Sequence, residues 1–205
     1  YANNFEINFI SRKQNIEFNG SIYYTNLNNA IIRSNGTFNG LDSIMYDGSL
    51  SQVQTLKNSG KAYVFGFSYM INYKINNNLN LKSSVSFNQS KDLSTKLPLR
   101  HSSPIFGQTS INFTKRNIKV SYYINYNGKK DISNFSPSEL NKLYLYTKDG
   151  SPAWLTNNIS FIYNINYLAK INFSCENIFD IHYRSYSSGI SAPGRNFNIG
   201  LNMSF

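Results

Sequence analysis

Few side chains of this sequence are spaced in a way that catalysis would require. Two histidines, His101 and His182, stand far apart, and the 10 acidic residues are spread thinly. No serine lies in a Gly-x-Ser-x-Gly setting, and neither a paired-carboxylate motif nor a phosphate-binding glycine motif occurs. The single cysteine, Cys175, excludes an internal disulfide and a thiolate cluster for a metal. The sequence therefore predicts a protein that is not an enzyme and that has no resident metal or cofactor.

The polar and aromatic residues near the two histidines are better suited to binding. An arginine side chain pairs with a carboxylate or a phosphate through two hydrogen bonds, and a tyrosine ring offers a flat amphipathic surface to a chelate or a macrocycle. The alternative is that these side chains only pack loop against loop. The predicted ligand-binding set is Arg100, His101, Tyr144, Tyr146, His182, Tyr183, Arg184 and Tyr186.

Strands must position these residues. The alternation of apolar and polar residues that indicates a strand is clearest at the end of the chain. From position 196 to 205, Phe197, Ile199, Leu201, Met203 and Phe205 alternate with Asn196, Asn198, Gly200, Asn202 and Ser204. A period of two predicts a strand with one apolar and one polar face. The polar faces of the neighbouring segments consist mostly of Asn, Ser, Lys and Tyr, which suits the wet interior of a barrel.

Similar segments occur along the whole chain, joined alternately by tight turns and by long polar loops. The most aromatic of them runs from Tyr63 to Tyr73, where every second residue is apolar. No apolar run approaches the roughly 20 residues that a membrane-spanning helix needs. We therefore expect an all-β fold: an antiparallel transmembrane β-barrel segment of about nine strands, which is a partial barrel, with the aromatic row on its convex face.

The long loops are expected over residues 35–49, 91–106 and 128–153, and before the last strand. If short turns and long loops alternate, all long loops leave from the same end of the sheet, and the predicted ligand-binding residues project from that end. The connection from Gly128 to Ala153 is the longest, and its segment from Leu140 to Tyr146 could form one or two helical turns. It is the best candidate for an element that moves over a pore mouth.

The last 30 residues resemble the C-terminal signature of TonB-dependent outer-membrane receptors. In that family, an "ENxxD" strand end leads through an extracellular loop to a "PGRNF" entry into the last strand, which ends on an aromatic residue. Two further pieces are similar, one over residues 58–67 and one over residues 98–107. The matching residues of the signature are Asn177, Asp180, Tyr183, Arg184, Gly189, Pro193, Gly194, Arg195, Asn196, Phe197 and Phe205.

The resemblance implies a barrel of about 22 strands with an N-terminal plug, so we expect residues 1–205 to be the C-terminal portion, with the plug and earlier strands absent. Tyr1 is not preceded by a secretion signal, and we expect the biological N-terminus upstream. The implied function is TonB-dependent uptake of a scarce nutrient of the ferric siderophore, haem or cobalamin type. The implied partners are the TonB complex, acting through the missing plug, a small-molecule chelate or vitamin, outer-membrane lipid with lipopolysaccharide, and the barrel assembly machinery.

Three alternatives stay open. The chain could belong to a passive porin-like or glycan-importing outer-membrane barrel, or His101 or His182 could ligate haem iron, as loop histidines do in some receptors of this family. The net charge of +10 also fits a soluble basic nucleic-acid-binding β domain. Lysine and arginine are scattered over turns and loops, however, so we expect no nucleic-acid partner and a location in the bacterial outer membrane.

Overall fold

The computed structural model describes residues 1–29, 31–58 and 60–204 of the chain. Within these residues, nine long strands form one antiparallel sheet, which confirms the expected all-β fold and the strand number. The strands are β1 (Ala2–Lys13), β2 (Ile16–Asn28), β7 (Lys61–Lys74), β8 (Leu79–Asp92), β9 (Phe106–Lys115), β10 (Ile118–Asn127), β13 (Trp154–Asn164), β14 (Ala169–Glu176) and β15 (Asn196–Met203).

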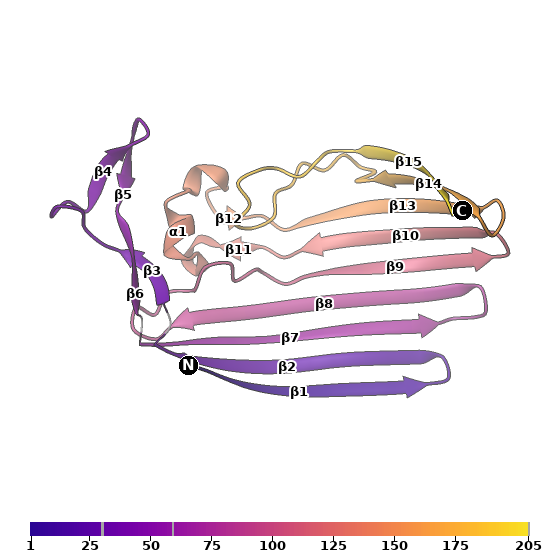
Figure 1. Cartoon of the computed structure of the whole chain (residues 1–205), viewed down its shortest axis with the longest axis horizontal. Helices are drawn as coiled ribbons and strands as arrows, with labels where there is room; N and C mark the ends of the chain where they lie inside the picture. Colours follow the sequence, from indigo (N-terminus) through magenta and orange to yellow (C-terminus); the bar gives the residue numbers. More distant parts are fainter. Residues whose placement is uncertain (30, 59, 205) are drawn as a thin grey trace.

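Each long strand pairs with the next long strand along the chain, in the order β1-β2-β7-β8-β9-β10-β13-β14-β15. Tight turns join the strands at one end of the sheet, and the long connections all lie at the other end (Figure 1). We call these the turn end and the loop end. In the described part of the chain, β1 and β15 are the two edges, so the sheet is not closed.

The strands are staggered relative to one another. A single row of paired residues starts at Lys13, the last residue of β1 at the turn end, and reaches Phe197 near the loop end of β15. Between them the row runs through Ile16, Tyr73, Leu81, Ile111, Tyr122, Ile159 and Cys175. A progressive shift of this kind is the register of strands that tilt around a barrel axis.

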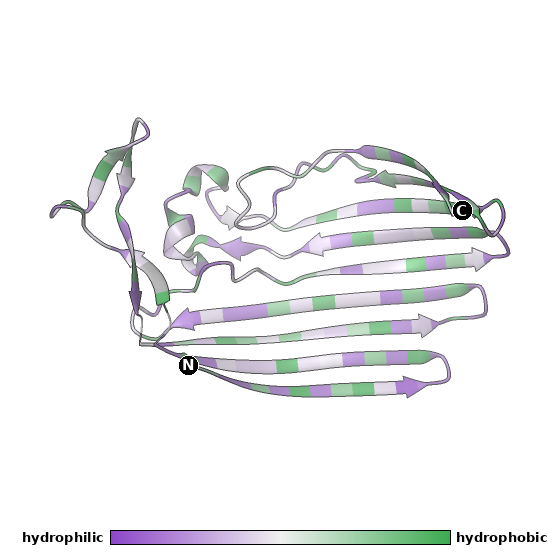
Figure 2. Cartoon of the chain, in the orientation of Figure 1, coloured by the Kyte–Doolittle hydropathy of each residue, from purple (hydrophilic) through white to green (hydrophobic). Residues whose placement is uncertain are grey.

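The two faces of the sheet differ in composition, which appears as alternating hydropathy along the strands in Figure 2. The face that carries the row just described is the apolar face, and the opposite one is the polar face. Phe65 is 38% exposed and Phe197 is 64% exposed, so these apolar-face residues do not lie in a closed core. The buried strand residues lie mostly on the polar face, among them Ser90, Ser121, Thr156 and Asn158. This distribution places the apolar row on the outer side of the sheet.

Amide and hydroxyl side chains on the polar face hydrogen-bond from strand to strand. Asn80 donates to Asn72 (2.7 Å), Ser121 to Asn112 (2.8 Å) and Gln108 to Asn125 (2.8 Å). Asparagine also builds the tight turns: the Asn76 Oδ1 atom accepts from the backbone N–H groups of residues 78 and 79, and Asn166 does the same for residues 168 and 169. The abundance of asparagine therefore follows from the fold.

The long connections carry short elements of their own. Between β2 and β7, β3 (Ile31–Asn35) pairs with β6 (Gln54–Asn58), and β4 (Ser43–Tyr46) pairs with β5 (Ser49–Gln52). The expected irregular loop over residues 35–49 thus contains part of a hairpin. The connection between β10 and β13 holds β11 (Lys130–Asp131), β12 (Gly150–Ser151), a 3-10 turn (Ile132–Asn134), α1 (Pro137–Leu140) and a second 3-10 turn (Leu143–Leu145).

Helices contribute little to this fold. None in the described ranges is long and apolar enough to cross a membrane. Cys175 lies on the apolar face as its parity requires, but Cys175 is buried, because it stands beside Ile159 and Phe197 in the register.

Candidate functional site

All eight residues predicted to bind a ligand lie in connections at the loop end of the sheet (Figure 1). Arg100 and His101 follow β8, Tyr144 and Tyr146 follow β10, and the other four follow β14. The alternation of turns and loops predicted this common location. Whether these residues contact a ligand stays a prediction, but their contacts with one another are well defined.

A buried carboxylate joins two of these connections. Glu139 is 1% exposed, and its Oε2 atom accepts a hydrogen bond from the Tyr146 hydroxyl (2.5 Å). Its Oε1 atom accepts from the Ser187 hydroxyl (2.7 Å), and the Ser187 backbone N–H donates to Tyr146 (3.2 Å). We call Glu139, Tyr146 and Ser187 the Glu139 clasp, because it holds the β10–β13 connection against the last loop.

Aromatic rings pack beside the clasp. The ring centroid of Phe135 lies 4.6 Å from that of Tyr146 and 5.2 Å from that of Tyr186, and the Phe135 side chain is fully buried. The Lys130 Nζ atom stands 4.6 Å from the centre of the Tyr186 ring and donates a hydrogen bond to the Ser102 carbonyl. These contacts tie the connection after β8 to the other two.

Arg184 and Tyr183 also contact residues near the Glu139 clasp. Arg184 donates from Nη1 to the Leu145 carbonyl (2.9 Å) and from Nη2 to the Ser191 hydroxyl (3.3 Å). The Tyr183 ring packs at a tilt of 39° against Trp154, the first residue of β13, with 4.3 Å between ring centroids. Three of the eight predicted residues, Tyr146, Arg184 and Tyr186, thus pack loop against loop, which is the alternative that the sequence left open, and Tyr183 packs against a strand.

The remaining four predicted residues are exposed: Arg100, His101, Tyr144 and His182. His182 shares a hydrogen bond with Ser191 (3.1 Å), and His101 has a left-handed backbone with φ +62°. In residues 1–29, 31–58 and 60–204, no group of three or more His, Cys, Asp or Glu side chains is placed to hold a metal ion. Ligation of haem iron by His101 or His182 stays a prediction.

The pKa values of Glu139 and Tyr146 in the clasp, and of Lys130 beside it, are shifted from their ordinary values. Burial of the Glu139 carboxyl opposes its ionisation, but the hydrogen bonds from Tyr146 and Ser187, with the charges of Lys142 and Arg100, outweigh burial and hold its pKa below the ordinary value of 4.5. Burial and the hydrogen bond to Glu139 raise the pKa of Tyr146. Burial lowers the pKa of Lys130 to about 8. At neutral pH, the clasp therefore contains an ionised carboxylate and a neutral phenol.

This acidity predicts a pH dependence of the loop assembly. Because the pKa of Glu139 is lower in the folded loops than in the free chain, its contribution is complete above about pH 4.5 and is lost as the pH falls through the folded pKa. We expect amide hydrogen exchange in residues 135–146 and 183–188 to accelerate, relative to β13, when the pH falls from 7 to about 3. Glu139→Gln removes the ionisation but keeps the shape of the side chain: its amide oxygen can accept one of the two hydrogen bonds, and its amide nitrogen must donate in the other. Exchange in this variant should therefore lack the transition. An identical transition in Glu139→Gln would assign the effect to another group.

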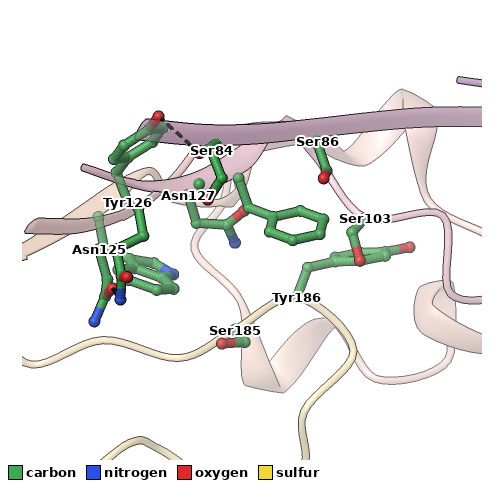
Figure 3. A pocket seen from close by; sticks show the side chains of 12 residues that line it. Ser84, Ser86, Ser103, Asn125, Tyr126, Asn127, Ser185 and Tyr186 are labelled. Carbon is green, nitrogen blue, oxygen red and sulfur yellow. Dashed lines mark hydrogen bonds between the residues drawn. The ribbon is translucent and has the colours of Figure 1, made fainter. Parts of the chain in front are cut away.

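A polar cavity of about 510 Å³ lies between the sheet and the loops. Figure 3 shows Asn125, Asn127 and Tyr126 from β10 on one side, and Ser103, Ser185 and Tyr186 from the loops on the other. The walls also include Phe106, Gln108 and Trp154. Of the predicted ligand-binding residues, Tyr186 lines this cavity.

A second cavity, of about 980 Å³, lies farther out between the β3–β6 hairpin, the connection after β8 and α1. Its walls combine aliphatic side chains, among them Leu27, Leu56, Leu97, Leu99 and Leu140, with polar ones, and its charged residues are Lys57, Arg100 and Asp92. Arg100, from the predicted set, thus lines a cavity other than the one that Tyr186 lines. The structure distributes the predicted site over two places.

Known structures share this architecture. The chain superposes over 100% of its length on the copper transporter OprC, with a TM-score of 0.79 and 13% sequence identity, and on the FrpB iron transporter from Neisseria meningitidis, with a TM-score of 0.72 and 17% identity. The ferric enterobactin receptor PfeA from Pseudomonas aeruginosa gives a TM-score of 0.74 at 14% identity. All three are TonB-dependent receptors with outer-membrane β-barrels. The chain has the fold of a TonB-dependent receptor barrel wall.

The chain spans about 30% of the length of these receptors: 31% of OprC and of PfeA, and 30% of FrpB. Neither a protein-family model nor a curated protein sequence matches it. The similarity is therefore one of fold, and the open nine-strand sheet is consistent with a partial barrel.

The residues of the C-terminal signature close the base of the last loop. Asn177, which is buried, donates to the carbonyls of Ile181 (2.9 Å) and Pro193 (3.3 Å) and accepts from the Ile181 N–H (2.9 Å). The Asp180 Oδ1 atom accepts from the Arg195 N–H (2.7 Å), and a Cβ atom at Gly194 would stand 2.5 Å from it. The signature thus joins the strands on either side of the loop. Phe205, its last residue, lies outside the described residues.

Loss of the Asn177 side chain should therefore loosen the last loop. Asn177→Ala removes the two hydrogen bonds with Ile181 and the one with Pro193, each worth roughly 0.5–1.5 kcal/mol. We expect the loop from 178 to 195 to become sensitive to protease in the assembled receptor, while the strands stay protected. Asn198→Ala, on the polar face of β15, is the matched control and should not change cleavage. Equal protection of both variants would contradict this role for Asn177.

Several residues of the site could be recognised only weakly, or not at all, from the sequence pattern. Asn127 and Trp154 could have been placed on the polar face from strand parity alone, because they alternate with the apolar residues of β10 and β13. Glu139 and Lys130 carry no such signal. Glu139 contacts Ser187 and Lys130 contacts Ser102, and both partners are distant in the sequence. A local sequence pattern therefore does not predict these contacts.

Proposed function

We propose that the chain forms part of the wall of an outer-membrane receptor that imports a scarce nutrient with energy from the TonB complex. The observation that carries the proposal is the barrel-type register of nine tilted strands with an apolar outer face. The superposition on complete receptors over the whole chain supports the same reading.

The apolar face has the dimensions and the composition of a lipid-facing band. Tyr63 and Tyr73 stand at opposite ends of β7, ten residues apart. At about 3.4 Å per residue and a tilt of about 40°, they are separated by about 26 Å along the membrane normal, close to the band of about 25 Å in such barrels. The tyrosine rings then lie at the two interfaces, where their hydroxyl groups contact water.

Charge and hydrogen bonding on the apolar face agree with contact to lipid. In the nine strands, its charged side chains stand only at or next to strand ends: Lys13, Lys61, Lys91 and Lys115. The polar side chains within the band bond to one another, as Ser83 does with Thr109 (3.0 Å) and Tyr122 with Asn157. Unpaired polar groups would be costly in hydrocarbon, and this pairing avoids the cost.

The partners follow from this location. The polar face would line the lumen, which a plug fills and on which TonB acts, and the loop end would face the medium with its lipopolysaccharide. Assembly would require the barrel assembly machinery. The ligand classes expected from the sequence, a ferric siderophore, haem or cobalamin, belong to this proposal as candidates, with Arg100, His101, Tyr144 and His182 as the exposed residues that could meet them.

A glycan-importing barrel is the second candidate, and the polar cavity favours it. None of the twelve residues that line this cavity carries a charge. A nucleic-acid-binding domain is disfavoured, because the aromatic rings and the charged side chains within the strands lie on different faces of the sheet. The aromatic rows lie on the apolar face, whereas Glu6, Lys82 and Lys119 lie on the polar face.

Uptake measurements test the proposal. Cells with and without the receptor gene, each with and without a working TonB complex, are compared for accumulation of radiolabelled ferric citrate, haem, cobalamin and maltose. We expect accumulation of one of them to require both the receptor and TonB. Accumulation that requires the receptor alone would favour the porin-like alternative, and absence of the receptor from the outer-membrane fraction would contradict both.

A further inference from the structure

The polar cavity contains a hydrogen-bond donor and an acceptor that are buried and unused. The Asn127 Oδ1 atom and the Trp154 Nε1 atom have no hydrogen-bond partner among the described residues, and Asn127 is 7% exposed. A buried polar group without a partner costs roughly 1–3 kcal/mol. Two such groups in one cavity are available to water or to a ligand.

The two residues that carry these groups are neighbours in the sheet. Asn127 and Trp154 are register partners on β10 and β13, on the same face of the sheet. Side chains of directly paired residues have Cβ atoms about 5 Å apart. One hydroxyl group can donate to the Asn127 oxygen and accept from the Trp154 N–H at the same time. The pair is therefore suited to a ligand that carries hydroxyl groups.

The remaining walls limit the ligand further. Phe106, Trp154 and Tyr186 present aromatic rings, while Gln108 and Asn125 offer amide groups that already bond to each other (2.8 Å). No lining residue is charged, so an anionic chelate would enter without a counter-charge, which is unfavourable. The Lys130 ammonium lies against Tyr186 but is committed to the Ser102 carbonyl. Amides for hydroxyl groups and aromatic faces for C–H surfaces are complementary to a pyranose ring.

We propose that this cavity binds one or two units of a neutral saccharide, with a sugar hydroxyl between Asn127 and Trp154. The site has a volume of about 510 Å³. It is formed by β8, β9, β10 and β13 together with the loops after β8 and β14, and the Glu139 clasp holds Ser187, the neighbour of the lining residue Tyr186. The inference rests on the proposed receptor function, because it names the class of nutrient that reaches the lumen wall.

Calorimetric titration of the intact purified receptor with maltose, cellobiose and diacetylchitobiose tests the proposal, with ferric citrate as the charged comparison. At least one disaccharide should bind. Trp154→Phe keeps an aromatic ring and removes the donor, and Asn127→Leu removes the acceptor. Each should weaken binding roughly tenfold, as expected for one neutral hydrogen bond with its partner left unpaired. The matched control Asn198→Leu changes the same residue type on the polar face of β15, outside the cavity, and should bind as the unmodified receptor does.

Three results would overturn the proposal: no binding of any of the three disaccharides, unchanged binding in both cavity variants, or ferric citrate binding that Asn127→Leu abolishes. The circular dichroism and heat-modifiability of each variant report whether the barrel is assembled, so a folding defect is not read as a binding defect. The outcome is separable from that of the uptake measurements. TonB-dependent uptake without saccharide binding would reject this site and keep the receptor function. Saccharide binding without a TonB requirement would keep this site and reject TonB-dependent import.

Discussion

Residues 1–205 expressed alone should not form a monodisperse, detergent-free monomer. Both edge strands expose unpaired backbone groups together with apolar side chains: Ile7 on β1 is 76% exposed and Ile199 on β15 is 82% exposed. Open edges of this kind pair with other chains, and in lipid each unpaired backbone group costs several kcal/mol. We expect the isolated chain to sediment as aggregates, and size-exclusion chromatography with light scattering measures this directly.

The control for this experiment is the complete receptor, in which further strands cover both edges. It should elute from detergent as one species and shift in gel mobility on heating. A cooperative unfolding transition of the isolated chain in aqueous buffer, at monomer mass, would contradict an open membrane wall and favour a soluble β domain.

An arginine introduced at the centre of the apolar face should strongly lower the free energy of unfolding. Ile159 lies near the middle of β13 in the apolar row, and Ile159→Arg places a charge within the lipid band. The expected cost is about 2–4 kcal/mol for arginine near the bilayer midplane. The free energy of unfolding, measured by urea titration of the receptor in lipid vesicles, should fall by this amount.

Its matched control is the adjacent residue, whose side chain points to the other face. Ser160→Arg introduces the same charge on the polar face of β13, where water is accessible, and should cost less than about 1 kcal/mol. Similar costs for the two variants would mean that the two faces do not differ in solvent, and the lipid-facing assignment would be wrong.

Strands were predictable because their signal is local. The alternation from Tyr63 to Tyr73 depends on residues that are close in the sequence, and the strand predicted there is confirmed by β7. The turn asparagines at 76 and 166 likewise bond to backbone groups two residues away. The common location of the loops followed from counting turns. The β4–β5 hairpin was missed because its strands have four residues each, too few to show a period.

Contacts between loops were not predictable in the same way. The Glu139 carboxylate meets Ser187, and Arg184 meets the Leu145 carbonyl, across sequence separations that no local pattern encodes. The sequence placed Tyr146, Arg184 and Tyr186 at the correct end of the sheet but could not distinguish ligand contact from loop packing. It also gave no reason to single out Asn127, whose importance rests on an unpaired oxygen atom.

Spin labels on β13 measure directly whether the apolar face of this sheet contacts lipid. In a Cys175→Ser background, single cysteines at 159, 160, 161, 162 and 163 are labelled in the receptor reconstituted in bilayers, and collision rates with oxygen and with a water-soluble nickel complex are measured. Labels at Ile159, Phe161 and Tyr163 should collide preferentially with oxygen, which concentrates in lipid, and labels at Ser160 and Ile162 with the nickel complex. The two collision profiles should therefore alternate with a period of two and in opposite phase. Oxygen and nickel profiles that rise and fall together, or that do not alternate, would contradict the account.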